Sequence, residues 1–303
     1  MRILLFGKNG QLGWELQRSL SVLGEVTALD SSGDASGPAD FDQPESLAAI
    51  VRRVAPEVIV NAAAYTAVDR AETDTAGAMR VNAEAPGVLA RTAAASGAWL
   101  IHYSTDYVFD GSGSEPWRED SPTAPLNAYG RSKLQGEALI RASGCRHLIL
   151  RTSWVYSARG DNFARTMLRL ARDREALTVI DDQVGAPTAA DLLADVTAHV
   201  LRATRSSAML ADTYHATASG ETSWHGYARH VIEVAARLGQ PLRVAPERVQ
   251  PVASSAYPQV AARPRNSRLA TTKLRDAFGL ALPPWQQGVE RMLAEILHRQ
   301  EPA

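Results

Sequence analysis

Tyr129 and Lys133 stand four residues apart in the segment YGRSK, a spacing that can support acid–base chemistry. The residues around them predict a helix over Ala128–Ala142, and residues four apart project from the same face of a helix. A tyrosine hydroxyl has an ordinary pKa of about 10, and a nearby ammonium group favours the phenolate, so we expect Lys133 to lower the pKa of Tyr129. The pair therefore predicts a tyrosine that protonates a substrate oxygen at neutral pH.

The segment WLIHYS, residues 99–104, is typical of a buried strand, and Thr105 and Asp106 follow it. In an open parallel sheet the carboxyl ends of the strands line the ligand crevice, so these side chains and the tyrosine–lysine pair are expected at the same rim. A tyrosine and a lysine at this spacing also occur by chance, as a packing tyrosine beside a solvated lysine. Their place after this strand favours the catalytic interpretation.

The glycine-rich loop GKNGQLG directly follows an aliphatic strand predicted over Arg2–Phe6 and opens a helix. Glycines at such a turn allow a pyrophosphate to approach backbone amides and a helix to pack tightly on a strand, while the helix N-terminus favours an anion. The pattern predicts a dinucleotide site formed by Gly7, Gly10, Gln11, Leu12 and Gly13. A glycine pattern alone can be a structural turn, but this position after the first strand favours a cofactor.

Asp30 follows the next predicted strand, Glu25–Leu29, where dinucleotide-binding folds place an acidic residue. Its carboxylate would accept hydrogen bonds from the adenosine ribose and repel the 2′-phosphate of NADPH, which favours NADH. Lys8 in the loop and the neighbouring Ser31 leave NADPH open. The sequence therefore predicts a nicotinamide cofactor, NADPH or NADH.

The other predicted cofactor contacts surround the same rim and comprise Asp40, Phe41, Ala63, Ala64, Tyr65, Tyr129 and Lys133. Asp40 and Phe41 are expected at the end of a third strand, near the adenine. The two alanines follow the strand Val58–Asn61, where small side chains would let the cofactor lie flat. The ammonium of the lysine could hold the hydroxyls of the nicotinamide ribose.

Short aliphatic runs alternate with helical stretches in the first half of the chain, as in βα units around a parallel sheet. Strands are predicted over Arg2–Phe6, Glu25–Leu29, Val58–Asn61, 99–104 and 147–151, and helices over Pro44–Val54, 77–95, Ala128–Ala142, 163–172, 190–202, 223–238 and 285–297. We predict an α/β protein with a Rossmann-type doubly wound parallel sheet and a smaller mixed α/β substrate lobe. Residues 1–152 would form mainly the dinucleotide-binding domain and 153–303 mainly the substrate lobe, with a segment around 185–205 returning to the first domain.

Composition and charge argue against several classes of protein. The formal net charge of −1 does not support nucleic-acid binding, so an anionic ligand requires a local cluster of arginines. Apolar runs are shorter than the roughly 20 residues that span a bilayer, and the start of the chain lacks the features of a secretion signal. Cys145 is the only cysteine, which excludes an internal disulfide and fits a reducing compartment. We expect a cytoplasmic protein with neither a membrane nor a nucleic acid as partner.

The glycine loop, the hydroxyl residue after the middle strand and the YxxxK pair resemble the extended short-chain dehydrogenase/reductase superfamily. Longer blocks, including VNAAAYTAVDRAE, STDYVFDG, RTSWVY, DQVGAPT and RPRNSRL, resemble the dTDP-4-dehydrorhamnose reductase family. The resemblance implies reduction of the C4 keto group of dTDP-4-dehydro-L-rhamnose to dTDP-L-rhamnose by NADPH or NADH. It further implies that Tyr129 donates the proton beside Lys133, that Thr105 polarises the carbonyl, and that the chemistry needs no metal.

The resemblance also implies a site for a nucleotide-linked sugar, made by Thr105, Asp106, Trp154, Arg263, Asn266 and Arg268. Forked guanidinium groups suit a diphosphate, and the tryptophan matches a residue that packs on the sugar ring in the family. A solvated basic loop and a core aromatic residue are the simpler interpretations. Tyr107 stands where similar sugar-nucleotide dehydratases place a glutamate, which disfavours dehydration.

Three carboxylates, Glu15, Asp191 and Glu295, match positions at which some similar proteins bind magnesium at a dimer interface. Hard cations favour carboxylate oxygen, so Mg²⁺ could support a homodimer here without entering the chemistry. Asp191 stands where glutamate is more familiar in the family, which shortens the reach to a metal. Exposed helix charges are the simpler explanation.

Two alternative functions remain open at this point. One is a reductase or epimerase that acts on another keto sugar nucleotide, because the shape of the pocket decides the substrate. The other is a non-catalytic NADP-binding regulatory subunit, since a similar fold attaches to a methionine adenosyltransferase. Intact Tyr129, Lys133 and Thr105 argue against the second alternative.

Overall fold

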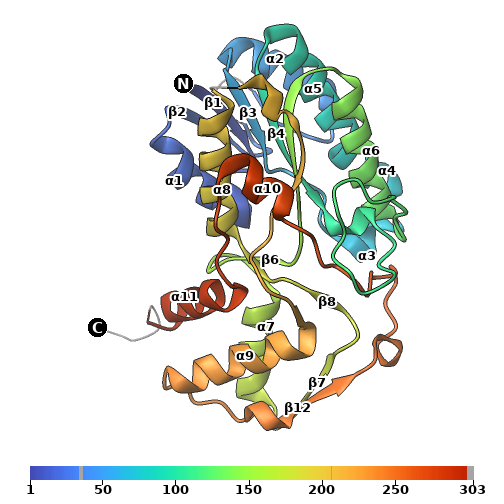
Figure 1. The fold of residues 1–303 in the computed structure, drawn as a ribbon, viewed down its shortest axis with the longest axis vertical. Helices are drawn as coiled ribbons and strands as arrows, with labels where there is room; N and C mark the ends of the chain where they lie inside the picture. The colour runs from blue at the N-terminus through green and yellow to red at the C-terminus, as the bar shows by residue number, and fades with distance from the viewer. Residues whose placement is uncertain (34–36, 206, 299–303) are drawn as a thin grey trace.

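A six-stranded parallel sheet forms the centre of the upper part of the molecule in Figure 1. The computed structural model of the chain describes residues 1–33, 37–205 and 207–298. The strands lie in the order β10-β5-β4-β3-β1-β2. Their bounds are β1 (Arg2–Phe6), β2 (Glu25–Leu29), β3 (Val58–Asn61), β4 (Trp99–Thr105), β5 (Arg146–Thr152) and β10 (Asp212–His215). Because the chain order reverses beside β1, the ligand crevice is expected at the carboxyl ends of β1 and β3.

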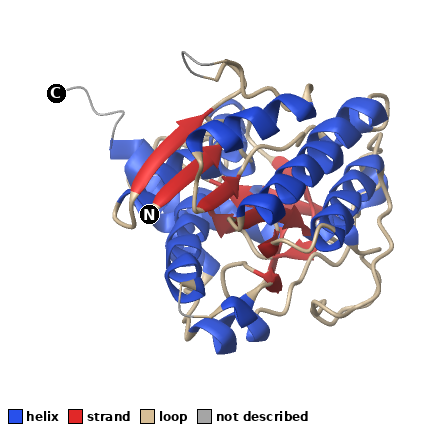
Figure 2. Ribbon diagram, turned by 90° about the horizontal axis from the view of Figure 1, so that it is seen from above, coloured by secondary structure: helices blue, strands red, loops and turns tan. Residues whose placement is uncertain are grey.

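Helices cover both faces of this sheet, as Figure 2 shows from above. One face carries α2 (Pro44–Val54), α5 (Ala85–Ser96) and α6 (Ala128–Ala142), and the other carries α1 (Gln11–Ser21), α8 (Ala190–Thr204) and α10 (Thr272–Phe278). Successive strand residues point to opposite faces, so Phe6 of β1 lies in the first core and Leu5 in the second. The doubly wound α/β fold predicted from the sequence is confirmed.

One helical stretch near the rim of the sheet contains a single wide turn. The helix predicted over 77–95 is present as α4 (Thr75–Met79), a π-helical turn η1 (Arg80–Glu84) and α5. The wide turn sets the carbonyl of Asn82 against α6, where a Cβ on Gly136 would lie 2.1 Å from that oxygen. Glycine at this position therefore lets α6 pack closely beside the turn.

The second half of the chain builds a separate core that lies below the sheet in Figure 1. Its elements are α7 (Phe163–Asp173), β7 (Leu177–Ile180), α9 (Trp224–Arg237), β12 (Val249–Val252) and α11 (Trp285–His298). Shorter elements are α3 (Val68–Ala71), η2 (Asp106–Val108), β6 (Val155–Tyr156), β8 (Val184–Gly185), β9 (Thr188–Ala189), η3 (Ala208–Leu210), β11 (Thr222–Ser223), η4 (Pro246–Arg248) and η5 (Ser254–Ala256). Buried Tyr156, Tyr227 and Trp285 fill this core.

The sequence located the first five sheet strands and missed the sixth, β10, whose short segment DTYH carries little apolar signal. The third strand expected to end at Asp40 is wrong: among the described residues, 37–43 form an isolated bridge, loop and turn, and 34–36 lie outside them. α8 packs against α1 and contributes to the core of the sheet. The last residues of the predicted substrate lobe, 299–303, also lie outside the described part. Within that part, every helix is too short or too polar to cross a bilayer.

Candidate active site

The glycine loop turns sharply between β1 and α1. Gly7 adopts a φ of +87°, and a Cβ on Gly13 would lie 2.0 Å from the carbonyl oxygen of Gly7. Only glycine therefore lets α1 approach the loop this closely. Gly10 precedes α1 and makes no side-chain cap, so no side chain occupies the first amides of the helix, at Gln11 and Leu12. These amides can meet an anion such as a pyrophosphate.

A cavity of about 240 Å³ opens beside this loop. It is lined by Gly7, Asn9, Gly10, Asp30, Ser31, Ala39, Asp40, Phe41, Asp42, Ala63, Ala64 and Val81. The glycine loop, the acidic residue after β2 and the alanines after β3 thus surround one space, which is the arrangement a bound adenosine requires. Tyr65 does not line this space, because its hydroxyl donates to Asp74 at 3.1 Å.

The Asp30 carboxylate is held as an anion at the edge of this cavity. Asn9 donates to its Oδ2 at 2.5 Å, Lys8 Nζ lies 3.6 Å from the same oxygen, and Ser32 donates to Oδ1. The hydrogen bond from Ser32, followed by the charge of Lys8, lowers the pKa of Asp30. An ionised carboxylate can accept hydrogen bonds from ribose hydroxyls, and the adjacent lysine partly offsets its negative charge.

Two of the adenine-side residues have structural partners of their own. Phe41 is buried and meets Phe6 edge-on at 5.5 Å between ring centroids, so most of its surface belongs to the core. Asp40 closes a turn by accepting the N–H of Asp42 at 2.9 Å. Both still border the cavity.

The hydroxyls of Thr105 and Tyr129 meet at the carboxyl end of β4. Thr105 donates to Asp106 Oδ1 at 3.1 Å and accepts the N–H of Tyr107 at 3.2 Å. Asn127 caps α6 by accepting the N–H of Gly130 at 2.8 Å, which places Tyr129 in the first turn. The ring of Tyr129 stands edge-on to Tyr107 at 5.6 Å.

Lys133 does not act on Tyr129 as the sequence suggested. Burial raises the pKa of Tyr129 to about 12, and a hydrogen bond with Thr105 opposes that rise. Lys133 Nζ instead donates to the carbonyl of Tyr103 at 2.6 Å. Burial lowers the pKa of Lys133 to about 8, against the charge of Glu137. The expected lowering of the tyrosine pKa is therefore wrong in this structure, and Tyr129 keeps its proton throughout the neutral range.

Asp106 is a second buried acid at this rim, with 2% of its surface exposed. Burial raises its pKa to about 7, against hydrogen bonds with Ser267 and Thr105. Its Oδ2 has no hydrogen-bond partner of ordinary geometry among the residues the structure describes. This oxygen is itself buried, so its position beside the rim, and not open access, makes it a candidate partner for a substrate hydroxyl.

A buried ion pair fixes the helix that carries the tyrosine–lysine pair. Arg151 of β5 donates to Glu137 of α6 through Nε at 2.8 Å and Nη2 at 2.7 Å, and Arg141 donates at 3.0 Å. Burial alone would raise the pKa of Glu137, but the hydrogen bonds and charge of Arg151 outweigh it and lower the pKa. The pair therefore ties α6 to the sheet behind the site.

We expect Glu137→Gln to lower the free energy of unfolding by roughly 3–5 kcal/mol, because it leaves a buried arginine without its counter-ion. Urea denaturation at pH 7 measures this loss, and Glu45→Gln, whose carboxylate is 87% exposed, is the matched control with a change within about 0.5 kcal/mol. The carboxylate has a lowered folded pKa, so its contribution is present above the unfolded pKa of about 4.3 and disappears as the pH falls through the folded value. Equal stability of the two variants at pH 7 would contradict this account.

A second cavity, of about 420 Å³, lies between the catalytic rim and the second core. It is lined by Tyr107, Phe163, Met167, Thr178, Val179, Ile180, Gln183, Trp224, Tyr257, Pro258, Gln259 and Arg263. Aromatic and aliphatic walls with a few polar groups suit a planar base. Tyr107 lines this cavity and meets the ring of Tyr129, so the cavity reaches the neighbourhood of the tyrosine hydroxyl.

Arg263 is the predicted arginine that reaches this cavity. Its guanidinium pairs with both oxygens of Asp69 in α3, at 2.9 and 2.8 Å. The predicted partners Asn266 and Arg268 do not line the cavity. Asn266 donates to the carbonyls of Ser112 and Glu115 at 3.2 and 2.9 Å. This geometry gives Asn266 a structural role in the loop.

Arg268 likewise finds its partner within the protein. Its Nε donates to Glu221 at 2.7 Å, and its Nη1 donates to Asn266 Oδ1 at 3.2 Å. Its side chain is 17% exposed. An ion pair at this position competes with a diphosphate, so direct substrate binding by Arg268 has no support from this geometry.

Trp154 has a strained backbone and a covered ring face. Its φ of +50° is unusual for a bulky residue. Its indole stacks on Trp224 with ring centroids 3.7 Å apart and planes 14° from parallel. Trp224 in turn donates to Gln183 at 3.2 Å. Trp224 therefore covers one face of the Trp154 indole. Trp224 itself lines the second cavity.

The three carboxylates predicted for magnesium do gather around one small pocket. Arg291 lines the same pocket and pairs with Asp191, while Arg18 lies 3.7 Å from Glu15. Burial, with the charges of Asp191 and Glu295, raises the pKa of Glu15. Among the described residues no group of three or more His, Cys, Asp or Glu side chains is arranged to hold a metal ion. The magnesium hypothesis is therefore not supported.

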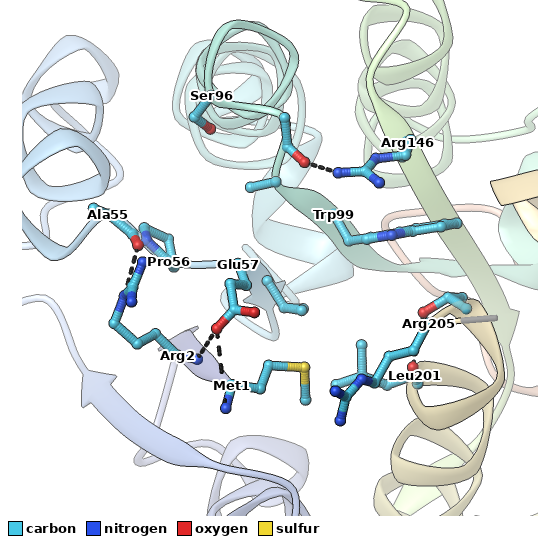
Figure 3. A pocket seen from close by; sticks show the side chains of 14 residues that line it. Met1, Arg2, Ala55, Pro56, Glu57, Ser96, Trp99, Arg146, Leu201 and Arg205 are labelled. Atoms are coloured by element: carbon cyan, nitrogen blue, oxygen red, sulfur yellow. Dashed lines mark hydrogen bonds and ion pairs between the residues drawn. The ribbon is translucent and has the colours of Figure 1, made fainter. Parts of the chain in front are cut away.

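A further cavity, of about 400 Å³, lies at the amino ends of the strands (Figure 3). Its lining includes neither the glycine loop nor Tyr129. Arg2 Nε donates to the carbonyl of Ala55 at 2.9 Å, and Arg146 donates to that of Gly97. These carbonyls end α2 and α5, so the two arginines satisfy helix C-termini. We assign this cavity no part in the reaction.

Sequence reasoning missed the aromatic wall of the second cavity. Phe163, Trp224 and Tyr257 lie far apart in the chain and carry no motif, and the first two also resemble ordinary core residues of amphipathic helices. Asn9 stands at a position of the loop that the glycine pattern leaves unspecified, so no sequence signal marked its contact with Asp30. Only the folded chain brings these residues to the two cavities.

Comparison with known proteins places the chain in a family. The family model described as the RmlD substrate binding domain matches residues 1–298. A dTDP-4-dehydrorhamnose reductase of Shigella flexneri is 53% identical over 98% of both chains. Crystal structures of dTDP-4-dehydrorhamnose reductases are also similar: that from Clostridium acetobutylicum has a TM-score of 0.88 at 32% identity, covering 98% of this chain and 100% of that one. That from Bacillus anthracis, in complex with NADP, has a TM-score of 0.85 at 32% identity, covering 97% and 99%. The chain therefore belongs to the dTDP-4-dehydrorhamnose reductase family.

Proposed function

We propose that the protein reduces the C4 keto group of dTDP-4-dehydro-L-rhamnose to a hydroxyl, giving dTDP-L-rhamnose, at the expense of NADPH or NADH. The observation that carries this proposal is that a glycine-loop cavity and the paired hydroxyls of Thr105 and Tyr129 lie at the carboxyl edge of one sheet, in a chain 53% identical to a dTDP-4-dehydrorhamnose reductase. The near-complete coverage of both chains supports the same activity here.

The cofactor would lie along the carboxyl ends of β1 and β3. The residues present fit it, because the loop leaves free amides at the start of α1 and because a Cβ on Gly7 would lie 2.7 Å from the N atom of Ala63. Asp30 would accept the adenosine ribose, and Lys133 would hold the nicotinamide ribose. Lys8, 3.6 Å from Asp30, softens the repulsion of a 2′-phosphate, so both cofactors suit the site.

The reaction adds a hydride and a proton across the carbonyl. Reduced nicotinamide, when bound, supplies the hydride to C4. Tyr129 gives the proton from its hydroxyl to the carbonyl oxygen as negative charge develops there. Thr105, once its hydroxyl turns from Asp106, donates a hydrogen bond to the same oxygen and orients it. The raised pKa of Tyr129 ensures that the hydroxyl is protonated before each turnover.

The second cavity would take the nucleotide part of the substrate. Its aromatic walls suit the thymine ring, and Arg263 would meet the diphosphate once its pair with Asp69 opens. Asp106 would accept a hydrogen bond from a sugar hydroxyl. Trp154, whose indole stacks on Trp224, would lie beside the sugar ring.

A direct assay tests the proposed activity. Purified protein is mixed with dTDP-4-dehydro-L-rhamnose and either NADPH or NADH, and the absorbance of the reduced nicotinamide is followed. We expect oxidation that depends on the sugar nucleotide, with dTDP-L-rhamnose as product. Cofactor binding without oxidation would instead favour a non-catalytic regulatory subunit, and oxidation only with a different keto sugar nucleotide would favour the other alternative.

The pH profile should show the titration of Lys133. Its pKa is lowered to about 8 by burial, so its ammonium is lost as the pH rises through that value. We expect kcat/KM, which reports groups of the free enzyme, to fall about tenfold per pH unit above pH 8. A profile flat to pH 10 would show that the charge of Lys133 is dispensable.

The cellular location and the oligomeric state of the protein follow from weaker signals. We propose a cytoplasmic enzyme that acts on a small nucleotide sugar, in agreement with its single buried cysteine, Cys145. A homodimer is also proposed, and sizing of the purified protein by light scattering tests it.

A further inference from the structure

A buried histidine, His102, stands behind Lys133 in the central strand β4. It is fully buried, and its Nε2 lies 3.4 Å from Lys133 Nζ. On the other side of the ring, its Nδ1 lies 3.1 Å from Nδ2 of Asn61. Asn61 and His102 are register partners in the neighbouring strands β3 and β4. The three side chains therefore form one buried row from β3 to α6.

The hydrogen bonds of Asn61 fix the direction of this row. Its Oδ1 accepts the N–H of Ala63 at 3.1 Å, so its amide nitrogen is the group that faces His102. An amide nitrogen is only a donor, and Nδ1 of the imidazole must therefore be the acceptor. Burial, followed by the charge of Lys133, keeps the pKa of His102 well below its ordinary value, so the ring is neutral. A neutral ring that accepts at Nδ1 carries its hydrogen on Nε2.

The hydrogen on Nε2 consequently points toward Lys133. An ammonium group has three hydrogens and no lone pair, so it cannot accept a hydrogen bond from Nε2–H. The carbonyl of Tyr103, at 2.6 Å, is the acceptor that remains for the ammonium. A neutral amine, by contrast, can accept from Nε2–H. The tautomer of His102 therefore favours the uncharged form of Lys133 over the charged one.

Few other charged or titratable groups reach Lys133 within the described part of the chain. On α6 itself, Glu137 stands one turn ahead and favours the ammonium, but its carboxylate is paired with Arg151 of β5. Tyr129 stands one turn behind. The packed turn η1 presents the uncharged amide of Asn82, which donates to Ser132 at 3.0 Å. Burial lowers the pKa of Lys133 against the charge of Glu137, and His102 is the ionisable side chain of β4 that contacts the ammonium.

We propose that His102, held by Asn61 as the neutral tautomer with hydrogen on Nε2, is a positioning residue that directs Lys133 toward the carbonyl of Tyr103 and weakens its hold on its proton. The functional part of this inference rests on the proposed reductase activity, since it makes His102 the residue that sets the upper pH limit of the enzyme. The structural part, the tautomer, does not depend on any activity.

The tautomer is tested first, in the wild-type protein labelled with ¹⁵N at its histidines. The His102 signals are identified by their loss in His102→Gln. We expect a neutral ring with hydrogen on Nε2 between pH 5 and 9. A protonated ring at neutral pH, or hydrogen on Nδ1, overturns the proposal.

The effect on Lys133 is tested with His102→Gln, whose side-chain oxygen can accept from the ammonium where Nε2–H could not. NADPH binding is followed by cofactor fluorescence. We expect the upper pH limits of NADPH binding and of kcat/KM to rise by at least one pH unit. Well above the wild-type limit, this shift corresponds to about tenfold more activity. His199→Gln, at an exposed position of α8, is the matched control and should leave both limits in place. A limit that stays unchanged in a folded His102→Gln protein overturns the proposal. If the protein binds NADPH but does not turn over, the proposed reaction is contradicted. The upper pH limit of NADPH binding then tests the role of His102 by itself.

Discussion

Tyr129→Phe is expected to lower kcat by about 10²–10⁴-fold while the protein stays folded and binds NADPH normally. The substitution removes the hydroxyl that would protonate the C4 oxygen and keeps the ring that stands edge-on to Tyr107 at 5.6 Å. The hydroxyl makes its contact with Thr105, so its loss removes one hydrogen bond and costs only about 1 kcal/mol of stability. We therefore expect a large loss of turnover with only a small loss of stability.

Tyr214→Phe is the matched control, because Tyr214 is a buried tyrosine of the sheet edge whose hydroxyl donates to the carbonyl of Leu210 at 3.0 Å. It should lose a similar amount of stability and keep full turnover. Stopped-flow measurement of a single turnover with excess enzyme separates the chemical step from product release. If Tyr129→Phe reduces the sugar at the wild-type rate, another group supplies the proton.

Gly13→Ala is expected to weaken cofactor binding strongly. A Cβ at this position would lie 2.0 Å from the carbonyl oxygen of Gly7 and 2.7 Å from its carbon, and both are backbone atoms that cannot rotate away. The loop must move off α1, which disrupts the amides that would receive the pyrophosphate. We expect NADPH affinity to fall by at least 100-fold, measured by isothermal titration calorimetry, together with a lower melting temperature.

Gly87→Ala in α5 provides the comparison for this variant. Its Cβ would lie 3.1 Å from Cδ1 of Leu139, the end of a flexible side chain, and alanine favours the helix by up to about 1 kcal/mol over glycine. This variant should bind NADPH with wild-type affinity. Wild-type affinity in Gly13→Ala would mean that the glycine loop does not shape the cofactor site.

The sheet and the cofactor side of the site could be predicted because local patterns determine them. Aliphatic runs marked five strands, and the spacing of Gly7, Gly10 and Gly13 marked a loop whose conformation only glycine tolerates. Ligands of parallel sheets bind at the carboxyl ends of the strands, which predicts Thr105 at the same rim as Tyr129. In the structure the hydroxyls of the two residues are in contact. Each of these steps uses residues that are close in sequence or a general property of parallel sheets.

The substrate side depends on contacts that are distant in sequence. The segment ARPRNSRL does not indicate whether each of its arginines faces a ligand or a carboxylate. The structure pairs Arg263 with Asp69 and Arg268 with Glu221. The stack of Trp154 on Trp224 joins residues of different elements in the same way. Such pairings follow from the packing of the second core, which leaves no short motif.

The electrostatics of the catalytic pair were also beyond the sequence. A spacing of four residues places Lys133 on the same helix face as Tyr129, but its ammonium donates to the carbonyl of Tyr103 and lies 3.4 Å from Nε2 of His102, both in the adjacent strand. Burial then raises one pKa and lowers the other, which reverses the simple expectation for the tyrosine. Desolvation of this kind depends on the whole surrounding core.

A crystal structure of the enzyme with NADP⁺ and dTDP-L-rhamnose tests the central claim most directly. The quantity to measure is the distance between the hydroxyl oxygen of Tyr129 and the C4 oxygen of the sugar. We predict a hydrogen bond of about 2.6–3.2 Å, with Thr105 as a second partner of the same oxygen. A sugar whose C4 oxygen meets Asp106 or water instead, with the Tyr129 hydroxyl turned away, would contradict the account.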